Sequence, residues 1–89
     1  PPDEKEPVIL SVDSEGRYYL NIGDNKNAPL DAGSLVNRVA AVKALNPDTP
    51  VLVRGDQAVD YGRITRAMVL LQEAGVDKVG LMTEPDEAG

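Results

Sequence analysis

A strand–helix–strand unit in the second half of the chain limits the folds that this sequence can adopt. Val51-Leu52-Val53 is apolar on both faces, which is typical of an interior strand with neighbours on both edges. A helix is expected to begin after the N-cap residue Asp60 and to end before Gly75, and the last strand is expected over 78–83. Two strands joined through one helix should be parallel, with a right-handed crossover.

The first half of the chain predicts a β-hairpin followed by a helix. Apolar residues alternate over 8–12 and 17–22, and Asp13-Ser14-Glu15-Gly16 between them has the composition of a turn. Asp31 is the expected N-cap of a helix that runs to about Leu45. The apolar face of this helix holds Leu35, Val36, Val39, Val42 and Leu45.

The order β-β-α-β-α-β predicts an α+β fold, a two-layer sandwich with a four-stranded mixed sheet and two helices on one face. Ile9, Tyr19 and Leu52 should then point away from the helices. A sheet surface of this kind is usually buried by a second copy of the chain or by a partner.

Charge and proline divide the chain into three parts. We expect a flexible proline-rich acidic linker over 1–7, a folded domain over 8–85 and a flexible acidic tail over 86–89. The net charge is −6, but residues 1–6 carry −2 and residues 84–89 carry −3, which leaves −1 for residues 7–83. A nearly neutral body does not provide the cationic field that nucleic acids require.

The composition also argues against catalysis. The chain has no His and no Cys, so it lacks the usual general base, the thiolate nucleophile, a disulfide framework and the commonest transition-metal ligands. We expect no catalytic residues, cofactor or metal. An alternative remains, a small α/β hydrolase or transferase that uses Asp56, Asp60 and Tyr61 as acid and base groups. Helix capping accounts for both aspartates more simply. The longest apolar run, over 67–71, is far shorter than the ~20 residues of a membrane span.

Two segments resemble the C-terminal domain of the TolR/ExbD family: VLVRGDQAVDYG over 51–62 and LLQEAGVDKVGLMTEP over 70–85. The resemblance extends over nearly all of 7–85 and is strongest from Pro50 onward. The ending GLMTEP over 80–85 looks more like the TolR branch than the ExbD branch.

The resemblance implies a periplasmic, usually homodimeric domain, tethered to the bacterial inner membrane by a transmembrane helix upstream of this chain. TolR-like members work with TolQ-like and TolA-like partners in the proton-motive-force-driven Tol-Pal motor, and they are associated with peptidoglycan binding, outer-membrane integrity and constriction during cell division. The proton-carrying aspartate belongs to the transmembrane helix, so no residue here is assigned a proton relay. An ExbD-like subunit that energises TonB-dependent iron-complex uptake is the nearest alternative, and a cytoplasmic ligand-binding domain is a third.

The family pattern also points to candidate site residues. Asp56, Val59, Asp60 and Tyr61 shape the loop before the second helix, where Tyr61 falls at the edge of the core face. The terminal strand offers Leu81, Met82 and Thr83 as a pairing edge. Arg63 and Arg66, near the start of the second helix, are candidates for contact with peptidoglycan or a partner.

Overall fold

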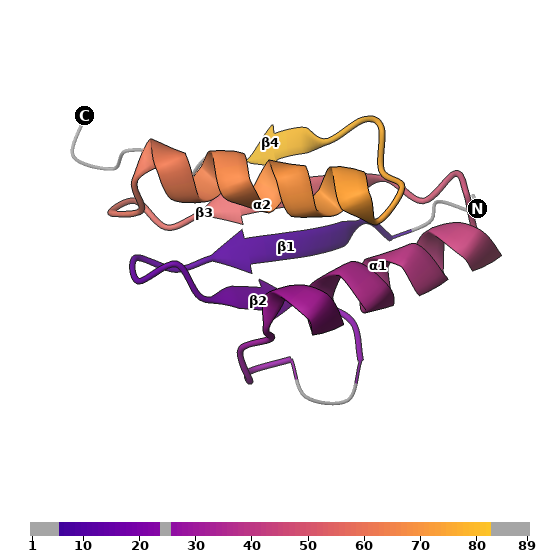
Figure 1. Cartoon of the computed structure of the whole chain (residues 1–89), viewed down its shortest axis with the longest axis horizontal. Coiled ribbons are helices and arrows are strands. Elements are labelled where there is room, and N and C mark those ends of the chain that lie inside the picture. The colour runs from indigo at the N-terminus through magenta and orange to yellow at the C-terminus, as the bar shows by residue number, and fades with distance from the viewer. Residues whose placement is uncertain (1–5, 24–25, 83–89) are drawn as a thin grey trace.

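The computed structural model describes residues 6–23 and 26–82 and contains a mixed sheet and two helices (Figure 1). The predicted order β-β-α-β-α-β is confirmed. Within the sheet the strands lie in the order β2-β1-β3-β4, so that β1 and β3 are interior and β2 and β4 form the edges. The elements are β1 (Val8–Val12), β2 (Tyr18–Leu20), α1 (Ala32–Leu45), β3 (Val51–Gly55), α2 (Tyr61–Glu73) and β4 (Gly80–Met82).

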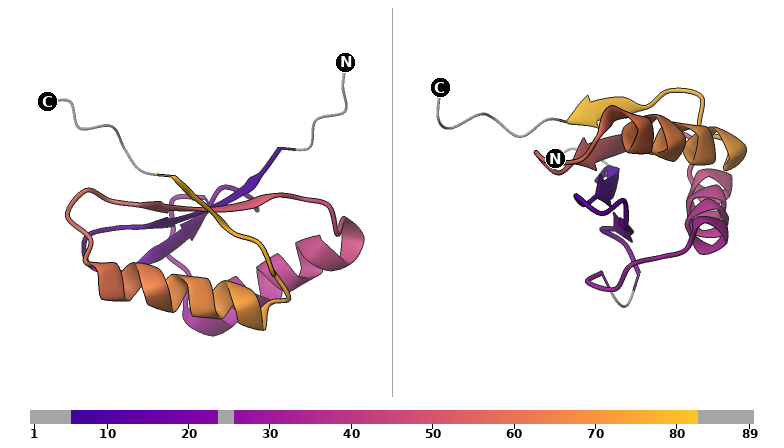
Figure 2. Two further views of the ribbon diagram at one scale, coloured as in Figure 1. Left: turned by 90° about the horizontal axis from the view of Figure 1, so that it is seen from above. Right: turned by 60° about the vertical axis from the view of Figure 1, so that its left-hand side comes forward.

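Both helices cover the same face of the sheet, and none of the described residues forms a helix over the opposite face (Figure 2). β1 runs antiparallel to β2 and parallel to β3, and β3 runs parallel to β4, which confirms the mixed sheet. Ile9 pairs with Leu52, and Ser11 pairs with Tyr19, and all four side chains are only half-buried on the face without helices. None of the helices in the described part of the chain combines the length and the hydropathy needed to cross a membrane.

The core lies between the sheet and the helices. Every second residue of β1 is buried, as are Val51 and Val53 of β3, because successive side chains of a strand point to opposite faces. Full burial of a Val, Leu or Ile side chain stabilises the fold by roughly 1.5–3 kcal/mol relative to leaving it exposed. The largest fully buried side chains are Leu10, Val12, Leu35, Val39, Val53 and Leu71.

The hairpin strand β2 is shorter than the sequence suggested. It was expected over 17–22 but ends at Leu20, because the Asn21 side chain accepts the Ile9 N–H in place of a backbone carbonyl, while the Asn21 N–H still donates to the Ile9 carbonyl at 3.3 Å. Asn21 Oδ1 accepts the Ile9 N–H at 2.8 Å, and Asn21 Nδ2 donates to the Pro7 carbonyl at 3.0 Å. Gly16 closes the turn with a φ of 85°, a conformation that favours glycine.

The helices begin and end where the sequence predicted, but the last residue of α1 is not buried as expected. Asp31 and Asp60 are the N-caps, and Gly75 follows the C-cap of α2 with a φ of 95°. Leu45 was expected to widen the buried face of α1, and this is wrong because 80% of it is exposed. The last turn of α1 extends past the strands, so Leu45 has no sheet to pack on (Figure 1).

Candidate functional site

A groove of about 290 Å³ lies where the edge strand β4 meets the start of α2. We call it the edge groove. It brings together the two groups of residues that the sequence singled out separately, the loop before α2 and the terminal strand. Its lining includes Asp56, Val59, Tyr61, Ile64, Leu81 and Met82.

The outer side of β4 is the uncovered edge of the sheet. Leu81 and Met82 are 54% and 37% exposed, although each pairs with β3 on its inner side. At the opposite edge, Leu30 forms a bridge with Tyr18 of β2 and donates its N–H to the Tyr18 carbonyl at 2.8 Å. Within residues 6–23 and 26–82, β4 is therefore the strand whose outer side carries no bridge. The third residue predicted for this edge, Thr83, lies outside the described residues.

The loop before α2 is held by Asp56. Its N–H donates to the Val12 carbonyl at 2.8 Å, which fixes the end of β3 beside the end of β1. Its Oδ1 accepts the Ala58 N–H at 2.8 Å, and its carbonyl accepts the Val59 N–H at 2.9 Å. The Asp56 carboxylate is thus engaged in a turn of the loop, and the helix-capping interpretation is wrong for Asp56 because the N-cap of α2 is Asp60. The turn that these hydrogen bonds hold places the half-buried Val59 in the edge groove.

Asp60 and Tyr61 play different parts at the start of α2. Asp60 Oδ1 accepts the Arg63 N–H at 2.9 Å as the N-cap of α2, and the same N–H lies 3.2 Å from the Asp60 carbonyl oxygen. Tyr61 does not pack in the core, because 81% of it is exposed. Asp60 therefore shapes the helix start, while Tyr61 forms part of the rim of the edge groove.

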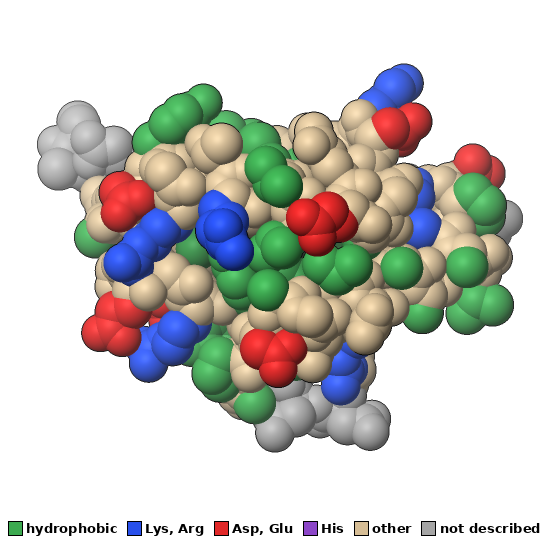
Figure 3. Space-filling model, in the orientation of Figure 1, with side chains coloured by type: hydrophobic (Ala, Val, Ile, Leu, Met, Phe, Trp, Pro, Cys, Tyr) green, Lys and Arg blue, Asp and Glu red, His purple; other side chains and the backbone are tan. Residues whose placement is uncertain are grey.

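The two arginines of α2 lie outside the lining of the edge groove and have different surroundings. Arg63 Nη1 donates to the Ser14 carbonyl of the β1–β2 turn at 3.2 Å, and Arg63 Nε lies 3.5 Å from Asp60 Oδ2. Arg66 is exposed and has no hydrogen bond or ion pair with another residue that the structure describes. Basic side chains lie over the start of α2 at the left of Figure 3.

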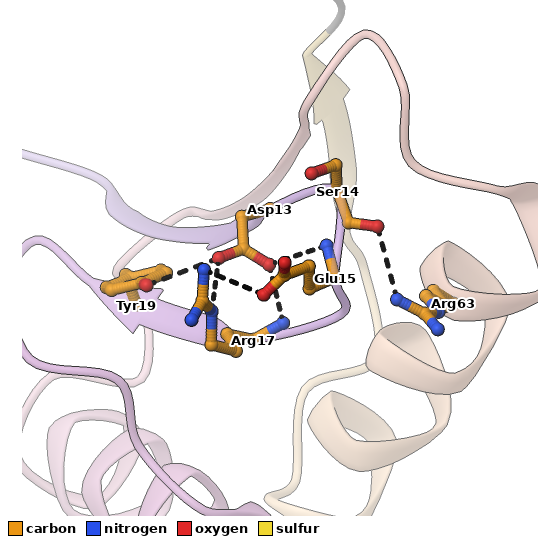
Figure 4. Close-up of polar contacts among 6 residues, drawn as sticks. All are labelled: Asp13, Ser14, Glu15, Arg17, Tyr19 and Arg63. Carbon is orange, nitrogen blue, oxygen red and sulfur yellow. Dashed lines mark hydrogen bonds and ion pairs between the residues drawn. The ribbon is translucent and has the colours of Figure 1, made fainter.

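The β1–β2 turn contains a polar cluster, whereas the sequence predicted only a turn here (Figure 4). Asp13 Oδ1 accepts the N–H groups of Glu15 at 2.9 Å and Arg17 at 2.8 Å. Asp13 Oδ2 accepts Arg17 Nε at 2.7 Å and the Tyr19 hydroxyl at 3.2 Å. These bonds, first among them the one from the Arg17 backbone, lower the pKa of Asp13 from 3.8 to about 2. The sequence signal that could have predicted this cluster is Asp13, which precedes Arg17 by four residues in a turn that contains a glycine.

A shallow depression of about 220 Å³ lies beside this cluster, at the carboxyl ends of β1 and β3. Asp13, Tyr19, Arg54 and Asp56 contribute to its lining. The described residues contain no group of three or more carboxylate, imidazole or thiol side chains placed to hold a metal ion. The arrangement offers surfaces for docking and no nucleophile paired with a base.

Comparison with known proteins identifies the family. A family model for the biopolymer transport proteins ExbD/TolR matches residues 1–86. The chain belongs to the ExbD/TolR family. This confirms the resemblance seen in the sequence. A family of biopolymer transport proteins is not a family of enzymes, so the hydrolase or transferase alternative is set aside.

Relatives from both branches of the ExbD/TolR family match the chain. The Tol-Pal system protein TolR of Pseudomonas aeruginosa is 41% identical over 92% of this chain and 60% of its own length. TolR of Escherichia coli K12 is 35% identical over 93% of this chain and 58% of its own length. The biopolymer transport protein ExbD of Neisseria gonorrhoeae is 31% identical over 90% of this chain and 54% of its own length. The chain thus spans between 54% and 60% of these relatives.

Proposed function

We propose that the chain is the periplasmic domain of a TolR-like subunit of the proton-motive-force-driven Tol-Pal motor, working with TolQ-like and TolA-like proteins. The identity to the two TolR relatives, 41% and 35%, exceeds the 31% identity to the gonococcal ExbD, which favours the Tol-Pal assignment. An ExbD-like role in TonB-dependent uptake of iron complexes is the second candidate. It is favoured by the same fold and by the ExbD matches over 90% of the chain.

The observation that carries the docking role is the uncovered edge of β4 beside an apolar groove. A strand whose outer N–H and C=O groups are unpaired is a template for a further strand. In this mode of recognition, main-chain hydrogen bonds supply affinity and side-chain pockets supply selectivity. The edge groove, lined by Val59, Ile64 and Leu81 among others, would receive an apolar side chain of the added strand.

The same edge suits a second copy of the chain, and we propose that the domain forms a homodimer through β4. A dimer and a partner strand would then compete for one edge, so the dimer is a state from which the partner can displace one subunit. Through this competition, movement of a membrane anchor attached to the domain would decide whether β4 binds a second copy or a partner strand.

Peptidoglycan is the proposed second ligand, in keeping with a role in outer-membrane integrity and in constriction during division. Arg66 supports this part of the proposal because its exposed side chain forms no hydrogen bond or ion pair with another described residue and can meet the carboxylates of the wall polymer. Arg66→Gln should weaken sedimentation with purified sacculi, and Arg38→Gln on α1 serves as the matched control. Equal loss in both variants would count against a specific role for Arg66.

We also propose that the domain lies in the periplasm and is tethered to the inner membrane through a transmembrane helix upstream of Pro1. The translated sequence before Pro1 tests this directly. We expect about 20 apolar residues interrupted by one aspartate, which would be the proton-carrying group. A hydrophilic upstream region would refute the anchor.

A pull-down experiment separates the two motor assignments. The chain is immobilised and offered TolA-like and TonB-like periplasmic domains at equal concentration. We expect capture of the TolA-like domain, loss of capture with Leu81→Lys, and unchanged capture with Val69→Lys, which changes an exposed valine of α2 outside the groove. Capture of the TonB-like domain alone would favour the ExbD-like role.

A further inference from the structure

Arg63 occupies a position in α2 that is electrostatically unfavourable for a cation. It is the third residue of the helix, where the unpaired backbone N–H groups carry a partial positive charge, and the first turn has no acidic residue. Its ion pair with Asp60 joins side chains that are 45% and 67% exposed, and such a pair contributes little to stability. A residue that goes against a local preference indicates that another interaction determines its position.

That interaction is the contact between Arg63 and the β1–β2 turn, 49 residues away in the sequence (Figure 4). The guanidinium donates to the Ser14 carbonyl, and the side chain lies against Gly16. A Cβ atom added to Gly16 would be 3.0 Å from both Cδ and Nη1 of Arg63, so any larger residue would push the guanidinium away. The turn is itself held by the four hydrogen bonds to the Asp13 carboxylate.

We infer that Arg63 is a positioning residue that holds the start of α2 against the β1–β2 turn and thereby sets the width of the edge groove. The next residue in the chain, Ile64, is 8% exposed and forms part of the groove wall with Val59 and Tyr61. The guanidinium itself points to the turn and is absent from the groove lining. Arg63 therefore shapes the docking surface without touching the partner. This inference rests on the proposed docking role of that groove.

Amide hydrogen exchange of the full 89-residue chain, followed by NMR, tests the positioning role without any partner. The informative amides are Gly16, Val59 and Ile64, which donate to Asp13, Asp56 and Asp60 respectively. In Arg63→Met we expect exchange about fivefold faster at all three, the factor that corresponds to one typical net hydrogen bond. Arg63→Lys keeps a donor of similar reach and should restore most of the protection. Arg66→Met, one turn further along the helix, should change none of the three.

Faster exchange confined to Gly16, or an equal effect of Arg66→Met, would overturn the inference because the groove wall would then be independent of Arg63. Binding to a TolA-like periplasmic domain adds a second measurement. Arg63→Met should weaken binding about fivefold with the salt dependence of wild type, and Arg63→Lys should recover it. A wild-type chain that fails to bind would refute the proposed docking role, while the exchange rates would still decide the position of Arg63.

Discussion

Leu81 of β4 pairs with Val53 of β3 in parallel register, yet Val53 is fully buried while Leu81 is 54% exposed. Paired residues of parallel strands point to the same face, so both side chains lie on the side of the helices. Val53 is enclosed because β1 and β4 flank its strand, whereas Leu81 has a neighbour on one side only. The sheet thus ends in an apolar surface that residues 6–23 and 26–82 leave uncovered.

A charge at this edge should separate self-association from folding. Leu81→Lys places an ammonium where an added strand would pack, so we expect dimerisation to be lost in sedimentation equilibrium. The free energy of unfolding should change by less than about 0.5–1 kcal/mol, because the replaced side chain is exposed. Val69→Lys, at a valine that is 46% exposed on α2, should leave self-association unchanged. Equal dimerisation of the Leu81→Lys chain would exclude β4 as the interface.

The N-cap of α2 gives a second prediction. Asp60→Ala removes the side-chain acceptor for the Arg63 N–H and should lower the free energy of unfolding by about 1 kcal/mol in urea denaturation. Asp60→Asn keeps an acceptor oxygen and should retain most of this contribution. If Asn and Ala were equally destabilising, charge rather than capping would explain the role of Asp60.

The acid dependence of stability should report on Asp13. The pKa of Asp13 is about 2 in the folded chain and 3.8 without these interactions, so the unfolded state binds its proton first as the pH falls. The stabilisation is therefore present above about pH 4 and is lost between about pH 4 and pH 2. Asp13→Asn should show a shallower loss of stability over this interval in thermal unfolding. An identical profile for both chains would contradict the depressed pKa.

Two leucines of the helices should differ strongly in their contribution to stability. Leu71 is fully buried, so Leu71→Ala should cost about 2–5 kcal/mol through lost burial and the cavity that remains. Leu45 is 80% exposed, and Leu45→Ala should change stability by less than about 0.5 kcal/mol. Chemical denaturation of both variants measures the difference. A large cost at Leu45 would mean that another surface covers the end of α1.

The sequence predicted the elements well because their signals are local. The caps Asp31 and Asp60 and the glycine after α2 mark helix ends through bonds to residues a few positions away. Leu45 was misassigned because periodicity along a helix does not tell how far the neighbouring sheet extends. The early end of β2 at Leu20 depends on an asparagine side chain that reaches back to Pro7 and Ile9, a contact that alternation does not contain.

The site was predicted in separate parts. The sequence singled out Asp56, Val59 and Tyr61 in one segment and Leu81 and Met82 in another, but their meeting in one groove follows from the crossover through α2. The hydrogen bond from Arg63 to the Ser14 carbonyl was not foreseen, because it joins the start of α2 to the β1–β2 turn, and these come together only when β1 and β3 lie side by side.

The central claim is that the edge of β4 and the start of α2 form the docking surface of this domain. A titration of the ¹⁵N-labelled chain with a TolA-like periplasmic domain, followed by amide chemical shifts, tests it most directly. We predict that the largest changes occur at Val59, Ile64, Leu81 and Met82. Changes concentrated instead at Ile9, Ser11 and Tyr19, on the sheet face without helices, would contradict the account.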